Sequence, residues 1–336
     1  MRAGVSFGPI DFLGDLPYVA ADGSCIVTDP RGNGRYAYAL VPTAASTWAF
    51  YRIDLYSRAV DLLAAPARAA TTVTARARMI FDVTGGALNT PTIWMFAPDT
   101  AGGVFFRWQS YSIVTDAWTA RNSTLAGMAA LAATDTSIAH PCRALGYTDD
   151  RYIYVNGDGG AWGGAAPSRM ARYDITTDTW AAVTGGGGAR AAAPAIGSSL
   201  DWLPNLPDFL FSMRGGGSGI CDIYSIAGNL WSAIPALDIN PGMALDTEGF
   251  YTATYFRFPY RLIYSNGGTI GVMDLTNCAS GIANPTATTD LIAQIDGLDG
   301  TAHQGNCLFP WNVGEKCYVG ILPHASKTPQ RIRITF

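Results

Sequence analysis

The chain has 336 residues, of which 49% are hydrophobic and 14% charged, and its formal net charge is −4 at pH 7. A chain this apolar is not intrinsically disordered, yet it has no apolar run near the roughly 18 residues that span a bilayer, so we expect no membrane insertion. Its 22 basic residues are scattered singly, which argues against binding to a nucleic-acid backbone. At the N-terminus, Gly4, Pro9 and Asp11 interrupt any hydrophobic core, so we expect no signal peptide.

Six short runs rich in aromatic and β-branched residues recur every 53 to 59 residues along the chain. Such runs are typical of strands buried between neighbouring sheets, and we expect them to be the inner strands of a repeated unit. They are Arg35–Leu40, Thr92–Phe96, Arg151–Val155, Asp208–Ser212, Arg261–Ser265 and Lys316–Gly320.

Glycine doublets follow four of these six runs. A glycine pair at the end of a strand allows a positive φ angle and a close approach between adjacent sheets. The doublets are Gly102 and Gly103, Gly159 and Gly160, Gly215 and Gly216, and Gly267 and Gly268.

A second series places a Tyr and a Trp seven residues apart around a segment typical of a hairpin turn. The two rings flank the turn, so we expect them to pack on one face of a sheet as a cross-strand pair. The three complete copies are Tyr111 with Trp118, Tyr173 with Trp180, and Tyr224 with Trp231. Two weaker copies, Ile53–Val60 and Met273–Ser280, keep part of the pattern.

A strand that ends in Gly-Gly, followed by a Tyr and then by a Trp seven residues later, resembles the kelch repeat. The resemblance covers almost the whole chain; the motif is complete in the second to fourth units, while the first lacks the glycine pair and the Trp and the fifth lacks the aromatic pair. It implies an all-β fold: one six-bladed β-propeller over residues 1–336, with four-stranded antiparallel blades. We expect blades at about 17–65, 70–122, 130–185, 195–238, 248–290 and 300–336.

The chain ends on an alternating run, Arg331–Phe336, which fits the third strand of the last blade. No residues follow it to form a fourth strand. We therefore expect the N-terminal segment, at about residues 5–16, to complete that blade and close the ring, which would also cover an exposed sheet edge.

Cysteine and histidine residues give no pattern of a metal site, because no close ligand pair occurs. We expect the cysteines to be buried thiols in a chain long enough to bury its own core, although the spacing of Cys307 and Cys317 would fit neighbouring strands. The six cysteines are Cys25, Cys142, Cys221, Cys278, Cys307 and Cys317, and the three histidines are His140, His303 and His324.

Catalytic patterns known from enzymatic propellers are also missing from the sequence. The three histidines are too far apart to assemble the copper site of galactose oxidase, a propeller enzyme related to kelch proteins, and the sialidase-type boxes are absent. Asp149 and Asp150 precede a strand as turn residues do, Asp296 begins a turn-like Asp-Gly-Leu-Asp-Gly segment, and Glu occurs only at Glu248 and Glu315. We expect no catalytic residues, no cofactor and no metal.

Three tryptophans, Trp162, Trp202 and Trp311, fall outside the repeated Trp position, and we expect them in loops between strands. There they either contact a sugar or a protein partner, or cap the packing between blades. Propellers similar to kelch proteins commonly serve as interaction platforms and also occur in bacteriophage tails.

The low charge fits a surface covered by neighbouring subunits. The low charge and the resemblance together favour a non-enzymatic structural or docking propeller in a larger assembly. We expect a virion component, of the tail or connector of a phage-like particle. It would be made in the cytoplasm and bound to other protein subunits. The alternative is a carbohydrate-binding propeller that recognises a glycan, and the third reading is a hydrolase or oxidase with an unfamiliar site.

Overall fold

The architecture is seen in a computed structural model of the chain. It describes residues 6–20, 24–29, 31, 34–44, 47–67, 77–83, 88, 90–98, 106–123, 136–139, 151–157, 170–183, 199–202, 208–215, 218–234, 246–249, 261–265, 270–274, 290–295, 308–313, 316–322 and 326–335.

The described strands form four-stranded sheets in which every neighbouring pair is antiparallel. The first three sheets are β2 (Cys25–Thr28), β3 (Tyr36–Ala44), β4 (Thr47–Asp54) and β5 (Val60–Leu63); β6 (Arg78–Asp82), β7 (Thr92–Pro98), β8 (Phe106–Ser112) and β9 (Ala117–Ala120); and β10 (Thr136–Ala139), β11 (Tyr152–Gly157), β12 (Met170–Asp174) and β13 (Thr179–Val183).

The remaining sheets follow in chain order, except that the last one begins and ends with segments from opposite ends of the chain. They are β14 (Ser199–Trp202), β15 (Phe209–Gly215), β16 (Ser218–Ser225) and β17 (Leu230–Ile234); β18 (Asp246–Gly249), β19 (Arg261–Ser265), β20 (Ile270–Asp274) and β21 (Asp290–Ile295); and β22 (Leu308–Val313), β23 (Lys316–Ile321), β24 (Gln330–Thr335) and β1 (Ser6–Phe12).

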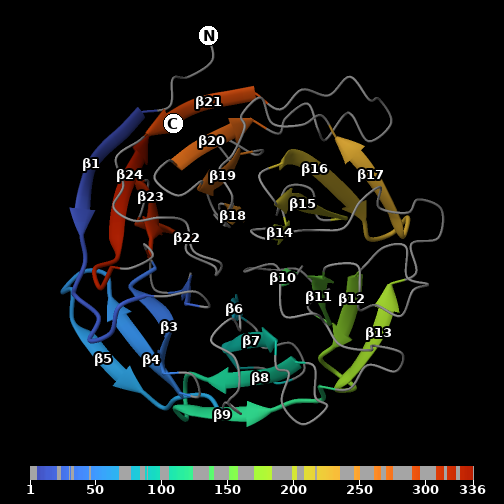
Figure 1. Cartoon of the computed structure of the whole chain (residues 1–336), viewed down its shortest axis with the longest axis horizontal. Helices are drawn as coiled ribbons and strands as arrows, with labels where there is room; N and C mark the ends of the chain where they lie inside the picture. Colours follow the sequence, from blue (N-terminus) through green and yellow to red (C-terminus); the bar gives the residue numbers. More distant parts are fainter. Residues whose placement is uncertain are drawn as a thin grey trace.

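These sheets are arranged radially around a central axis, like the blades of a propeller (Figure 1). Their innermost strands contact one another in the cyclic order β2, β6, β10, β14, β18, β22 and back to β2. The predicted all-β propeller of four-stranded antiparallel blades is therefore confirmed. The described residues form six such sheets, the same number as the copies of the aromatic strand series.

Two details of the prediction are wrong. The six aromatic runs form the second strand of each sheet, whereas the innermost strands in the first five sheets have only four or five residues, too few to show a period in the sequence. The fifth blade is also wider than expected, because its strands run from Asp246 to Ile295 and not from 248 to 290. The other expected boundaries enclose their strands.

The ring closes as predicted, by pairing β1 with β24. The register joins Ser6 to Thr335 at one end and Phe12 to Gln330 at the other. Beyond the strand the two chain ends stay together, because the Leu16 N–H donates to the Lys327 carbonyl at 2.8 Å and the Ala20 N–H to the Ser326 carbonyl at 2.8 Å. The N-terminal segment thus supplies the outermost strand of the last blade.

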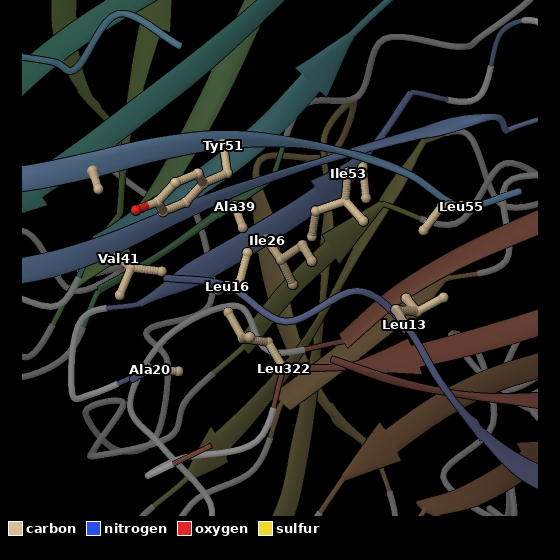
Figure 2. Close-up of a cluster of buried hydrophobic side chains, with 12 residues drawn as sticks. Leu13, Leu16, Ala20, Ile26, Ala39, Val41, Tyr51, Ile53, Leu55 and Leu322 are labelled. Carbon is tan, nitrogen blue, oxygen red and sulfur yellow. The ribbon is translucent and has the colours of Figure 1, made fainter. Parts of the chain in front are cut away.

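Buried side chains fill the junction between the last blade and the first (Figure 2). Leu13 and Leu16 of the N-terminal segment belong to the same buried cluster as Ile26, Val41 and other residues of the first blade, and Leu16 lies beside Ile26. Burying a leucine side chain stabilises a fold by about 1.5–3 kcal/mol. This cluster adds side-chain packing to the backbone pairing of β1.

Two arginines and one carboxylate hold the outer part of this junction. Asp11 on β1 lies between Arg58 of the first blade, at 3.0 Å, and Arg331 of β24, at 2.6 Å. Gly14 passes so near the first blade that a Cβ atom there would lie 2.1 Å from the Arg58 carbonyl oxygen, so this close approach requires glycine.

Candidate functional site

The repeated Tyr and Trp residues occupy matching places in three blades, directly opposite each other on the third and fourth strands. Their ring centroids are 5.1 Å apart for Tyr111 and Trp118 and for Tyr173 and Trp180, and 5.2 Å apart for Tyr224 and Trp231. All three tyrosines are buried. The predicted cross-strand pairs are therefore present in the structure.

In the second and third blades these pairs also bind the preceding blade. In the third blade the Tyr173 hydroxyl donates to Asp178 Oδ1 at 2.6 Å, and the same oxygen accepts the backbone N–H of Asn122 at 2.9 Å. Trp180 Nε1 donates to the carbonyl of Asn122 at 2.7 Å. One residue of the second blade is thus bound through both of its backbone polar groups.

The second blade repeats this arrangement with Asp116, which accepts from the Tyr111 hydroxyl at 2.8 Å and from the Ala64 N–H at 3.0 Å. Trp118 Nε1 donates to the Ala64 carbonyl at 2.8 Å. In the fourth blade Asn229 accepts the Tyr224 hydroxyl at 2.7 Å. Burial and then the hydrogen bond to a carboxylate raise the pKa of Tyr111 and Tyr173 above the ordinary tyrosine value. In the second and third blades the repeat motif is therefore a clamp between neighbouring blades, and the fourth blade keeps its Tyr–Asn hydrogen bond.

The residues that accept the tyrosine hydroxyl were not predicted from the sequence, although their shared position in the repeat was visible there. Asp116, Asp178 and Asn229 stand at one position of the three Tyr–Trp copies, and all three have a positive φ, of 48°, 53° and 50°. Asp and Asn adopt this left-handed conformation more readily than other residues with a Cβ atom. The first blade has Arg58 at this position, with φ of 65°, and this arginine pairs instead with Asp11.

The tryptophans expected in loops lie elsewhere. Trp202 belongs to β14 and is 1% exposed, packed in a cluster with Leu210 and Trp231, so of its two expected roles the structure fits packing and not contact with a ligand or partner. Trp311 lies within β22 rather than in a loop. The four residues of β14 are too few to show a period, which explains the error at Trp202. Trp162 lies outside the described residues.

Several other sequence expectations fall on parts of the chain that the structure does not describe. Gly215 ends β15 opposite Ser218, whereas the other seven glycines of the doublets lie outside the described residues, as do the three histidines and the Asp149 and Asp296 segments. Cys25 and Cys221 are buried thiols, as expected. Within the described ranges, no three His, Cys, Asp or Glu side chains are grouped as metal ligands, and no helix is long and apolar enough to cross a membrane.

One face of the ring carries two exposed clusters of similar composition. It is the face where the first strand of a blade connects to the second and the third to the fourth, and we call it the hairpin face. In the first blade two guanidinium groups lie over the Tyr36 ring, that of Arg35 at 5.2 Å from the ring centroid and that of Arg52 at 5.0 Å. In the third blade Arg151, at 5.1 Å, and Arg172, at 4.6 Å, lie over the Tyr152 ring.

An aspartate at the end of the third strand anchors each cluster. Asp54 accepts from Arg35 Nε at 2.8 Å and from the N–H groups of Tyr56 at 2.9 Å and Ser57 at 3.1 Å. Burial works against its ionisation, but Arg35 and the two backbone donors outweigh burial and lower the pKa of Asp54 to about 2. The same carboxylate thus starts the hairpin turn and holds the arginine.

Asp174 is the matching residue in the third blade. It accepts from Arg151 Nε at 2.9 Å and from the Thr176 N–H at 3.0 Å. The hydrogen bond from Arg151 is the main reason that its pKa is lowered, with burial acting in the opposite direction. Both clusters therefore contain one arginine bound to the aspartate at the end of the third strand and a second arginine over the same tyrosine ring.

Acid should weaken the Asp54 anchor in a defined range of pH. A carboxylate whose pKa is about 2 in the folded chain and about 4 in the unfolded chain stabilises the fold above pH 4, and this contribution disappears as the pH falls from 4 to 2. We expect wild type to be more stable than Asp54→Asn at pH 6, and the difference to vanish near pH 2. Urea unfolding at several pH values measures it, and a difference that stays constant from pH 6 to pH 2.5 would contradict the assignment.

Stacked arginines and half-buried tyrosines are suited to binding a polar ligand. The flat guanidinium presents its N–H groups at the rim while its face rests on the ring, so its orientation is fixed before a ligand arrives. Arg35, Arg151 and Arg172 are exposed, and Tyr36 and Tyr152 are half-buried. Among the described residues these two clusters are the candidate binding features of the hairpin face.

The sequence matches no protein-family model and no curated protein. Solved structures do resemble the fold. An auxiliary nutrient binding protein from Bacteroides ovatus aligns over 99% of this chain and 76% of its own, with 12% identity and a TM-score of 0.55. A second auxiliary nutrient binding protein, from Bacteroides thetaiotaomicron, aligns over 96% and 70%, with 8% identity and a TM-score of 0.54. The structure of YjhT aligns over 94% and 95%, with 12% identity and a TM-score of 0.52. At these identities the likeness shows a shared β-propeller fold.

Proposed function

We propose that the protein is a non-enzymatic binding propeller of the kelch type, whose ligand is a saccharide bound at the hairpin face. The observation that carries the proposal is the likeness, across nearly the whole chain, to two propellers described as nutrient binding proteins. The propeller fold is a scaffold for many functions, so a binding function also requires a site on this chain. The Tyr36 and Tyr152 clusters supply one, because tyrosine rings and arginines together offer stacking surfaces and hydrogen-bond donors.

A glycan array followed by calorimetry on the bound saccharides tests this proposal. We expect wild type to bind at least one class of saccharide, and Tyr152→Ala or Tyr36→Ala to weaken binding at least tenfold. Val114→Ala is a matched control, because Val114 is 74% exposed on the same face and outside both clusters. A folded chain that binds no saccharide, or whose binding is unchanged in both tyrosine variants, would contradict the proposal.

The second candidate is a docking propeller within a larger assembly, such as the tail or connector of a phage-like particle. The low charge of the chain, 14% of residues, favours it, because interface centres are poor in charged residues. Light scattering on the purified protein separates the two candidates. A discrete oligomer without saccharide binding would support the docking role, and a monomer that binds saccharide would support the first proposal.

A further inference from the structure

We propose that Arg172 binds the carboxylate of an acidic saccharide, at a place where the first blade carries a carboxylate of its own. The inference rests on the proposed function, since it names the chemical class of the ligand at the Tyr152 cluster. It follows from a comparison of the two clusters, which are built alike but differ in charge.

The strand register sets the two clusters in correspondence. In the first blade Arg52 lies opposite Tyr38 on the second strand and opposite Asp61 on the fourth strand. In the third blade Arg172 lies opposite Tyr154 and opposite Ala181. The two arginines therefore occupy the same position of the blade, and the residue facing them on the outer strand changes from Asp to Ala.

Asp61 shows what kind of group this position accepts. Its Oδ2 atom accepts from Arg52 Nη2 at 2.8 Å and from Arg52 Nε at 3.2 Å, while the guanidinium rests over Tyr36. The N–H groups at one edge of the Arg52 guanidinium thus bind a carboxylate, and its face contacts an aromatic ring. A charge-assisted pair of this kind is stronger than a neutral hydrogen bond.

Arg172 has the aromatic contact without the carboxylate. Its guanidinium lies 4.6 Å from the Tyr152 ring centroid, and no carboxylate in the described part of the chain forms an ion pair with it. Ala181, across the strand pair, is exposed and leaves the edge of the guanidinium accessible. The nearby Arg151 is already paired with Asp174 at 2.5 Å.

A second carboxylate is also replaced across the blade interface. Beside the Arg52 cluster the clamp residue of the next blade is Asp116, whereas beside the Arg172 cluster it is the neutral Asn229. Burial raises the pKa of Tyr111 and of Tyr224, and Arg52 and Arg172 respectively oppose that rise, which places each arginine within electrostatic reach of its clamp tyrosine. Around Arg172 two carboxylates are thus replaced by neutral residues: the one on the outer strand of its own blade and the one in the clamp of the next blade.

The geometry points to a carboxylate because the first blade fills the same position with one. A uronic acid combines that carboxylate with a ring of hydroxyl groups, which the Tyr152 ring and Arg151 can contact. Because the Tyr152 ring contacts the guanidinium of Arg172 and the pair with a carboxylate is charge-assisted, we expect Arg172 to contribute about tenfold to affinity, which is about 1.4 kcal/mol.

Exchanging residues between the two blades tests the inference. The probes are glucuronate, glucose and acetate, titrated by NMR or calorimetry into wild type, Arg172→Gln, Ala181→Asp and Ala181→Asn. We expect glucuronate to bind about tenfold more tightly than glucose, and Arg172→Gln to remove that preference. Ala181→Asp supplies the internal carboxylate and should remove it too, whereas Ala181→Asn, of equal size and no charge, should retain most of it. Both positions are exposed, so these variants should fold like wild type, which circular dichroism verifies.

The reciprocal substitution, in the first blade, is an independent test. Asp61→Ala should open the Arg52 position and add a second, weaker site for glucuronate. Acetate binding that is lost in Arg172→Gln would support the carboxylate site by itself. Equal binding of glucose and glucuronate, unchanged in Arg172→Gln, would overturn this inference and leave the proposed saccharide function standing. A folded protein that binds none of the glycans on the array would overturn the proposed function instead, and acetate binding at Arg172 would then be the separate measure of the carboxylate site.

Discussion

Removal of residues 1–16 is expected to abolish the cooperative unfolding of the monomer. The deletion takes away all of β1, exposes the edge of β24, and removes the buried Leu13 and Leu16 side chains. Large-to-small changes at buried leucines cost about 2–5 kcal/mol each, and an uncovered strand edge promotes pairing with a second chain. Thermal melting together with light scattering should show either an unfolded chain or an oligomer.

A milder variant keeps this prediction testable if the truncated chain cannot be purified. Leu16→Ala should lower the free energy of unfolding by about 2–5 kcal/mol, because Leu16 is fully buried. Leu62→Ala is the matched control, since Leu62 is 71% exposed on β5 and its loss should cost under about 0.5 kcal/mol. A truncated chain that stays monomeric with an unchanged melting temperature would show that β1 does not hold the ring closed.

Asp178→Ala is expected to lower the free energy of unfolding by about 3 kcal/mol. The Tyr173 hydroxyl and the Asn122 N–H both lose their acceptor, and an unsatisfied buried donor costs about 1–3 kcal/mol. Alanine must also adopt the positive φ of 53°, which costs roughly 1 kcal/mol. Urea unfolding at neutral pH measures the total.

Asp178→Asn distinguishes the contribution of the hydrogen-bond acceptor from that of the negative charge. Asparagine keeps an acceptor oxygen and tolerates the left-handed backbone, and the fourth blade already carries Asn229 in this place. We expect it to cost under about 1 kcal/mol. If Asp178→Ala and Asp178→Asn were equally mild, the clamp would contribute little to the packing between blades.

Much of the fold could be predicted from the sequence because a propeller repeats one local unit. The Tyr173 and Trp180 spacing around a turn is a cross-strand pair wherever it occurs, and the unpaired C-terminal strand required a partner from the other end of the chain. The innermost strands were harder to predict, because a strand of four residues, such as Ser199–Trp202, is too short to show an alternating pattern. Trp202 was misplaced for that reason.

The candidate site could be predicted only in part of its geometry. Arg52 and Asp61, like Arg172 and Ala181, face each other across a local hairpin, but Tyr36 lies on a different strand from Arg52 and the two meet only when β3 pairs with β4. The clamp between blades could not be predicted from the sequence, because Asp178 accepts from the backbone of Asn122, which is 56 residues away.

The sequence by itself determined the repeated strand unit, the aromatic pairs of the third and fourth strands, and the closure of the ring, because each depends on local spacing and on counting strands. Only the tertiary structure decided which polar side chains bridge neighbouring blades and which remain exposed on the hairpin face. The physical reason is that the charge around Arg52 and Arg172 is set by residues on the next strand and the next blade, Asp61 and Asp116 in one case and Ala181 and Asn229 in the other.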